Sequence, residues 1–247
     1  MNFITGNKFK SLADDYLDQS KPYIDLSKKP EKIFLFTDWV DIFKQQILPK
    51  IDYQFKLITH NADTGVYEKH LDLLNDNRLL KWFGMNCHVE HEKLVPIPIG
   101  IANEQWPHGD ERLLERVMSK TVEKINRIYC NFNPLTNPFR RKVLDQIRTN
   151  PAVDIEKNRL DHKSYWEKLA TYKYVISPPG NSVDCHRIWE SLYLGTIPIC
   201  LNDIPLKTFT DLPIMFIESF EDFELKESDG KVERLSFDYW RKIIKNV

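Results

Sequence analysis

The residues best suited to chemistry lie in one stretch, residues 172–203, where a strand, a turn and a helix are expected in succession. A short apolar run ends at Ser177, and two prolines followed by Gly180 then make a rigid turn. Three residues here, Asn181, Ser182 and Asp184, are candidates to cap the next helix, and together with Ser177 and Gly180 they are candidates to bind a ligand. The N-terminus of a helix that follows a parallel strand presents free N–H groups and a partial positive charge, so we expect an anion such as phosphate to bind here.

Two charged side chains follow on the expected helix of residues 184–195. Arg187 lies in its first turn, where a guanidinium can hold a phosphate through two parallel hydrogen bonds. Glu190 comes three residues later on the same helix face, where a carboxylate can accept hydrogen bonds from the two hydroxyls of a ribose. Groups that donate hydrogen bonds to phosphate, beside a carboxylate that accepts hydrogen bonds from a diol, would form a nucleoside diphosphate site. The alternative is an Arg187–Glu190 ion pair on an ordinary capped helix.

A second polar loop, residues 131–141, also follows an expected strand and leads into a helix. We therefore expect it at the same edge of the sheet. Asn131 is a candidate to bind phosphate or sugar, and Arg140 or Arg141 is a candidate to neutralise a leaving diphosphate. The alternative is a solvated pair of arginines.

Transfer of a group to a hydroxyl needs a general base, and the best candidates follow the expected strand of residues 54–61. Asp63 and His60 are the two candidates for this base, and Asn61 beside them is a candidate to bind the acceptor. The alternative is that Asp63 or Thr64 caps the helix that follows.

Further acceptor candidates lie in two other loops. Asn86 belongs to residues 83–94, a polar loop that also contains His88. Trp106 belongs to the loop after residue 100, where its aromatic face can pack on the C–H surface of a sugar ring. His108 and Asn103 share that loop and are candidates for the same role.

Strands and helices alternate along the chain, which is typical of α/β proteins with parallel sheets. After an N-terminal helix and loop, the first half has expected strands at 32–38, 54–61 and 93–100, and expected helices at 39–51, 67–83 and 111–124. The second half has expected strands at 125–132, 152–157, 173–180, 196–202 and 214–217, and expected helices at 138–150, 164–172, 184–195 and 236–247. We therefore expect two small Rossmann-like domains that face a cleft, residues 1–122 and 123–247, with a seam near residues 118–126.

Composition and missing motifs exclude several classes of protein. The formal net charge of −1 argues against nucleic-acid binding through bulk charge. There is no apolar run long enough to span a membrane and no signal-peptide pattern, so a cytoplasmic protein is expected. The four cysteines form no CxxC pair, which predicts buried free thiols rather than disulfides or a zinc site. GxGxxG, GxxxxGK[ST] and GxSxG are all absent, which argues against dinucleotide-binding, P-loop and hydrolase folds.

Residues 164–203 resemble the donor-binding segment of exostosin-like glycosyltransferases. That segment has a strand that ends in P-x-G (here residues 173–180), a helix with R-x-x-E/D (here Arg187 to Glu190), and then G-x-I-P-V (here residues 195–199). The α-1,3-fucosyltransferases have a similar strand, helix and GTxP arrangement. The resemblance implies the GT-B fold, in which the second domain holds a nucleotide sugar and catalysis takes place in the cleft. It also implies inversion at the sugar and no metal, and the sequence has no DxD motif.

The sequence and the resemblance together predict a glycosyltransferase that moves a sugar from a nucleotide-sugar donor to a hydroxyl of a glycan or another acceptor, without a cofactor. We expect Arg187 to hold the diphosphate, Glu190 to hold the ribose, and Asp63 or His60 to remove the acceptor proton. The alternatives are a non-catalytic nucleotide- or carbohydrate-binding domain and an α/β hydrolase.

Overall fold

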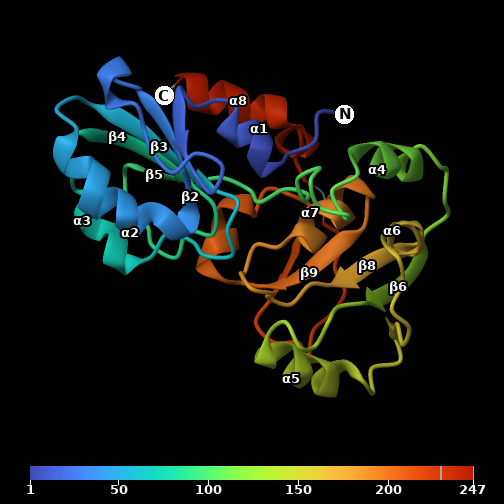
Figure 1. Cartoon of the computed structure of the whole chain (residues 1–247). Helices are drawn as coiled ribbons and strands as arrows, with labels where there is room; N and C mark the ends of the chain where they lie inside the picture. Colours follow the sequence, from blue (N-terminus) through green and yellow to red (C-terminus); the bar gives the residue numbers. More distant parts are fainter. Residues whose placement is uncertain (229, 247) are drawn as a thin grey trace. The chain divides into compact units, whose positions relative to one another are not determined.

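The computed structural model describes residues 1–228 and 230–246, which form two compact units (Figure 1). The first unit contains residues 4–99 and 237–246, and the second unit contains residues 1–3 and 100–236. Each unit contains a parallel five-stranded sheet flanked by helices. The expected α/β fold with two Rossmann-like parts is therefore confirmed.

The boundary between the units lies at residues 99/100 and not in the expected seam near residues 118–126. The reason is that helix α4 (Glu111–Met118) packs on helix α6 (His162–Ala170), so that residues 100–122 belong to the second unit. The units thus differ from the expected domains of residues 1–122 and 123–247, because side-chain packing and not chain order decides which residues form one core.

The sheet of the first unit has its strands in chain order, all parallel. They are β1 (Asp15–Leu17), β2 (Lys32–Phe36), β3 (Phe55–His60), β4 (Leu79–Gly84) and β5 (Leu94–Pro96). Strand β5 is an edge strand, as the prolines of that segment predict, because proline cannot donate to a ladder. Strand β1 was not expected from the polar N-terminal segment.

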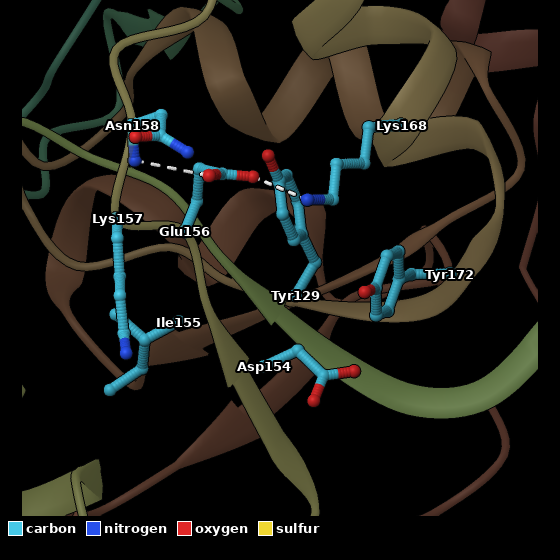
Figure 2. Close-up of a pocket in the computed structure, with 8 residues that line it drawn as sticks. All are labelled: Tyr129, Asp154, Ile155, Glu156, Lys157, Asn158, Lys168 and Tyr172. Atoms are coloured by element: carbon cyan, nitrogen blue, oxygen red, sulfur yellow. Dashed lines mark hydrogen bonds and ion pairs between the residues drawn. The ribbon is translucent and has the colours of Figure 1, made fainter.

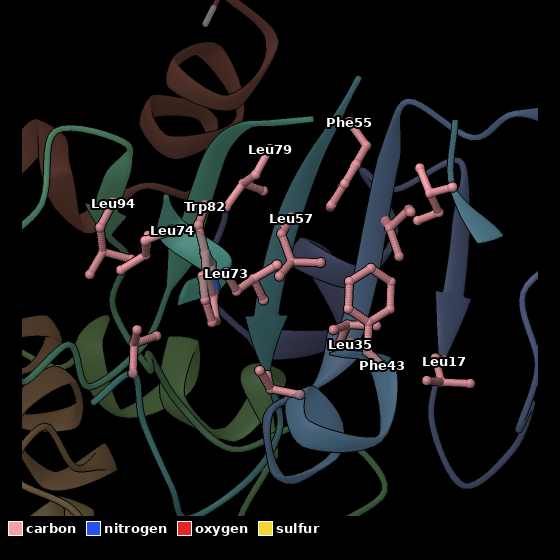
Figure 3. Packing of buried hydrophobic residues seen from close by; sticks show 14 of the residues in the cluster. Leu17, Leu35, Phe43, Phe55, Leu57, Leu73, Leu74, Leu79, Trp82 and Leu94 are labelled. Atoms are coloured by element: carbon pink, nitrogen blue, oxygen red, sulfur yellow. The ribbon is translucent and has the colours of Figure 1, made fainter. Parts of the chain in front are cut away.

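Short helices cover this sheet, and the last helix of the chain is among them (Figure 1). They are α1 (Gly6–Lys10), α2 (Val40–Ile42) within a helical run of residues 37–50, α3 (Leu71–Leu74) and α8 (Phe237–Asn246). Phe237 of α8 packs edge-on against Phe9 of α1, with the ring centroids 5.3 Å apart, so the C-terminal helix belongs to the core of the first unit. That core also contains the cluster of buried leucine and aromatic side chains in Figure 3.

The expected helix of residues 67–83 is only partly present. A 3-10 turn (Glu68–His70) and α3 are followed by β4 instead of by more helix. The helix ends at Asn75, and the next apolar residues belong to strand β4 of the sheet. Trp82 shows why: it is buried in β4, where its Nε1 donates to Thr59 Oγ1 at 2.9 Å on the neighbouring strand.

The sheet of the second unit has the order β10-β9-β8-β6-β7. Its strands are β6 (Ile125–Cys130), β7 (Val153–Ile155), β8 (Tyr172–Ile176), β9 (Ile197–Leu201) and β10 (Met215–Ile217). The chain runs from β6 to β7 on one side of it and then to β8 on the other side. Strand order therefore reverses between β6 and β8, and in open parallel sheets such a point forms a ligand-binding crevice at the carboxyl ends of the strands.

The helices of the second unit are α4, α5 (Pro138–Ile147), α6 and α7 (His186–Tyr193). Gly195 follows α7 at φ +67°, the left-handed conformation that favours glycine just after a helix. Short 3-10 turns lie at Leu26–Lys28 in the first unit and at Ile204–Phe209 and Val232–Leu235 in the second. Among the described residues, none of the helices has both the length and the apolar character needed to cross a membrane.

Candidate functional site

Two loops of the second unit meet where the strand order of its sheet reverses. The loop after β6 ends at Asn137, whose Oδ1 caps α5 by accepting from Phe139 N at 2.9 Å. The amide nitrogen of the same side chain donates to the carbonyl of Gly180 in the loop after β8, at 2.8 Å. One asparagine thus fixes the start of α5 and joins both loops at the position where α/β sheets bind ligands.

Arg140 is buried between these two loops, with 5% of its surface exposed. Its Nε donates to the carbonyl of Pro179 at 2.8 Å, and its Nη1 donates to the carbonyl of Asn133 at 3.1 Å. A Cβ on Gly180 would come within 2.8 Å of Arg140 Nη2, so the glycine leaves room for the guanidinium. The sequence left the choice between Arg140 and Arg141 open, and the structure buries Arg140 and leaves Arg141 exposed.

Arg140 and Arg187 share the ring of Phe132. Their guanidinium carbons lie 5.5 Å and 5.8 Å from its centroid, within the range of a cation–π interaction. Burial, together with the charge of Arg187, lowers the pKa of Arg140 to about 10. Two like charges held this close to one ring form a strongly cationic site, and an anion between them would relieve their repulsion.

Arg187 has donor groups that the protein leaves unused. Its Nε and Nη1 are buried, and neither has a hydrogen-bond partner within the described part of the chain. A buried charged donor without an acceptor is costly, so it points to a partner that arrives from outside. The expected phosphate contact of Arg187 stays a prediction, and these two donors are the groups that could make it.

Glu190 is also buried, with 4% of its surface exposed. Burial raises its pKa to about 7, and the charge of Arg187 opposes part of that rise. The Tyr165 hydroxyl and Trp166 Nε1 face this carboxylate, but neither completes a hydrogen bond with good geometry in the described chain. His162 Nε2 lies 3.7 Å from Glu190 Oε1.

Protein groups surround the carboxylate of Glu190, and its expected contact with a ribose stays a prediction. The alternative, a direct Arg187–Glu190 ion pair, is not formed, because no nitrogen–oxygen contact within 4 Å joins the two among the described residues. Glu190 instead acts on Arg187 as a buried negative charge at longer range.

The N-terminus of α7 is not capped as the sequence suggests. The N-cap residue is Cys185, which makes no capping hydrogen bond with its side chain. Asp184 is buried and accepts from Trp189 Nε1 at 2.7 Å, so its carboxylate supports the helix from inside. Ser177 Oγ lies 3.7 Å from Cys185 Sγ, and Ser182 accepts from Gly180 N at 2.8 Å through its main-chain carbonyl. Asn181 is exposed in the same turn.

A small pocket lies beside strand β7, and Figure 2 shows it. It has a volume of about 200 Å³ and is lined by Tyr129, Asp154, Ile155, Glu156, Lys157, Asn158, Lys168 and Tyr172. Asn131 Nδ2 donates to the Tyr129 hydroxyl at 3.0 Å, which connects the loop after β6 to this pocket. The Tyr129 ring stacks on Tyr172 with centroids 4.9 Å apart and also lies parallel to Tyr165, whose centroid is 6.4 Å away.

The expected general bases lie in the first unit, and His60 is tied into its core. Asn61 N donates to His60 Nδ1 at 2.7 Å, and His60 Nε2 donates to the carbonyl of Pro98 at 3.1 Å. Both ring nitrogens are therefore occupied, and Phe9 stacks on the ring with centroids 5.4 Å apart. This environment fits a structural histidine rather than a base, because a base needs an unoccupied nitrogen that the substrate can reach.

The other candidates of the first unit have varied surroundings. Asp63 is exposed, and neither it nor Thr64 caps the next helix, since the N-cap of that 3-10 turn is Tyr67. Asn61 and Asn86 both adopt left-handed backbone conformations, at φ +66° and +49°. Asn86 is buried, and its main-chain carbonyl accepts from Val66 N, so its place is fixed by the fold.

Trp106 lies in the second unit, where it is exposed and its ring stacks near His108.

Three neighbours of Arg187 and Glu190 were not predicted from the sequence, namely Phe132, His162 and Tyr165. His162 is the first residue of α6, directly after the N-cap Asp161, whose Oδ1 accepts from Ser164 N at 3.0 Å. The signal for His162 and Tyr165 is their spacing of three residues, which places both on one helix face.

No group of at least three histidine, cysteine or acidic side chains suited to a metal occurs among the residues that the structure describes. No known protein family matches this sequence, and no curated protein is significantly similar to it.

Proposed function

We propose that the second unit binds a nucleoside diphosphate and that the protein is a glycosyltransferase with a nucleotide-sugar donor. One observation carries the proposal: Arg140 and Arg187 both contact the ring of Phe132 at the switch point of the sheet, and Arg187 keeps buried donors that no group among the described residues uses. Two guanidinium groups match the two phosphates of a diphosphate, and planar N–H forks match phosphate oxygens.

The proposed chemistry follows from where charge develops. When the bond between the sugar and the diphosphate breaks, the leaving oxygen takes the electron pair and becomes more negative. Fixed donors at that position stabilise the transition state more than the ground state. Arg187 and the N-terminus of α7 would supply those donors, and Arg140 would add its charge from between the two loops. In this arrangement, the arginines supply the positive charge that a metal supplies in other transferases.

The test is a thermal-shift screen with UDP, GDP, ADP and CMP, followed by their sugar conjugates. A nucleotide at a hundred times its dissociation constant stabilises the folded state by about 2.7 kcal/mol, which raises the melting temperature measurably. We expect this shift to be lost in Arg187→Gln, which removes the guanidinium and keeps a shorter polar side chain. Arg141→Gln is the matched control, because Arg141 is the exposed neighbour of Arg140 on the same helix.

Release of the free nucleoside diphosphate from the nucleotide sugar then separates two functions. A transferase forms the diphosphate only as sugar is passed on, to an added acceptor or more slowly to water. A binding domain shows the thermal shift and no release. No shift with any nucleotide in the wild-type protein would overturn the proposal.

A further inference from the structure

A short loop of the second unit presents an aromatic ring to solvent. Trp106 is 56% exposed, and its main-chain N–H donates to the carbonyl of Asn103 at 2.9 Å. Gly109 N donates to the carbonyl of Trp106 at 2.9 Å and closes the turn. A Cβ on Gly109 would lie 2.0 Å from the carbonyl oxygen of Asn103, so only glycine fits there. The loop is therefore tight, and it holds Trp106 outward in one place.

His108 lies in the same loop and faces the first turns of two helices. Its ring centroid is 5.9 Å from that of His162, the first residue of α6, and 6.1 Å from that of His186, the first residue of α7. The Trp106 ring lies 6.4 Å away and nearly parallel, with an interplanar angle of 26°. The loop thus places an imidazole and an indole together at the carboxyl edge of the sheet.

His108 differs from its histidine neighbours in its hydrogen bonds. His186 Nδ1 donates to the carbonyl of Gly100 at 2.8 Å, and the Nε2 of His162 is buried 3.7 Å from Glu190 Oε1. His108 is exposed, and its ring makes no hydrogen bond with any described part of the chain. Both of its nitrogens are therefore available to a bound molecule. Partial burial lowers the pKa of the His108 imidazole, which favours its neutral form.

The same contacts connect His108 to the proposed diphosphate site. His186 precedes Arg187 in the chain, and His162 approaches Glu190, the buried carboxylate that acts on Arg187. His186 therefore lies between His108 and Arg187, and His162 lies between His108 and Glu190. A hydroxyl bound at His108 would lie on the same edge of the sheet as a sugar attached to the bound diphosphate.

We propose that His108 is the general base of the sugar transfer and that Trp106 is the platform on which the acceptor sugar packs. This inference rests on the proposed function and assigns the base to the second unit, in place of Asp63 or His60. The acceptor hydroxyl gives its proton to a ring nitrogen of His108, and its oxygen forms the new bond to the anomeric carbon. The bond from that carbon to the diphosphate oxygen breaks, and its electron pair leaves with the nucleoside diphosphate. The imidazolium then releases the proton to water.

The test uses the full chain with UDP-glucose, UDP-N-acetylglucosamine, GDP-fucose and GDP-mannose as donors and methyl glycosides as acceptors. We expect His108→Gln to lower kcat by about 100-fold to 10,000-fold, the range of general-base catalysis, with an unchanged thermal shift by the nucleotide. His108→Gly should recover part of its activity when imidazole is added. Trp106→Ala should raise KM for the acceptor and leave KM for the donor unchanged. His91→Gln is the matched control, since His91 lies in the first unit, where its ring nitrogens contact Asn75 and Lys93.

The outcomes separate this inference from the proposed function. If the wild-type protein turns over and His108→Gln keeps more than half of its kcat, the base is another residue and the transferase remains. If nucleotide binds but no donor–acceptor pair reacts, the base assignment is overturned and a binding domain is supported. If no nucleotide binds the wild-type protein, the proposed function fails, and the catalytic assignment fails with it.

Discussion

Arg140 donates from Nε to the main-chain carbonyl of Pro179 across 2.8 Å, which ties helix α5 to the turn after β8. The same guanidinium donates to the carbonyl of Asn133 and faces the ring of Phe132. One side chain therefore holds both loops of the proposed diphosphate site and adds positive charge to it. Loss of Arg140 should consequently affect stability and binding together.

We expect Arg140→Met to lower the free energy of unfolding by about 2–4 kcal/mol, because two buried carbonyl groups lose a charged donor. Urea unfolding followed by circular dichroism measures this change. Arg141→Met is the control and should stay within about 0.5 kcal/mol of the wild-type protein, as exposed substitutions do. Equal effects of the two substitutions would show that the loops are held by other contacts.

Lys124 is a second cation with a structural role, and its side chain is half-buried. Its Nζ donates to the carbonyls of Ala170 at 2.8 Å and Leu194 at 2.9 Å, at the ends of α6 and α7, and to Thr196 Oγ1 at 3.0 Å. Lys124→Met keeps the apolar stem and removes these bonds, so we expect a loss of about 2–4 kcal/mol in urea unfolding. Lys120→Met, at an exposed ion pair with Glu167, is the comparison and should cost less than about 1 kcal/mol. A Lys124→Met protein as stable as Lys120→Met would contradict this role.

Glu190 should give the protein a measurable pH dependence. Its pKa is about 7 in the folded protein against 4.5 ordinarily, so between these values the folded state binds more protons than the unfolded state. The contribution of this group to stability is therefore complete below pH 4.5 and is lost as pH rises through 7. Glu190→Gln, neutral throughout, should lack this loss.

The measurement compares wild-type and Glu190→Gln proteins by urea unfolding near pH 5 and near pH 8. The difference between the two proteins is needed, since burial lowers the pKa of His162 to about 4 and this acts in the opposite direction. We expect the stability of Glu190→Gln relative to the wild-type protein to increase from the lower to the higher pH. A constant difference would mean that Glu190 is ionised at both pH values.

The fold was largely predictable from local patterns, and its failures have physical causes. The apolar run at β2 and the prolines in β5 predict these strands from a few local residues. Strand β4 could not be predicted in this way, because the spacing of Leu79 and Trp82 also suits a helix. Pairing with β3 places these residues in a strand. Strand β1 consists of Asp15, Tyr16 and Leu17, and it pairs with β2 without an apolar run to predict it.

Only those residues of the candidate site that lie in one local segment of the sequence could be predicted. Arg187 and the turn before α7 belong to one motif, and Arg140 follows the neighbouring strand. The role of His60 depends on the carbonyl of Pro98, 38 residues away, which local sequence cannot reveal. The surroundings of Glu190 come from a different helix, α6, so its burial could not be read from its own helix face.

Cys185 offers a test of the site that needs no substitution. It is half-buried at the N-terminus of α7, beside Arg187, whereas Cys87, Cys130 and Cys200 are buried. An alkylating reagent such as iodoacetamide should therefore modify Cys185 first in the folded protein, and peptide mass spectrometry locates the site. A nucleotide held by Arg187 would cover the same helix start, so we expect bound nucleotide to slow this alkylation in proportion to occupancy. Alkylation of Cys185 at an unchanged rate under saturating nucleotide would place the diphosphate away from α7, even if the nucleotide raises the melting temperature.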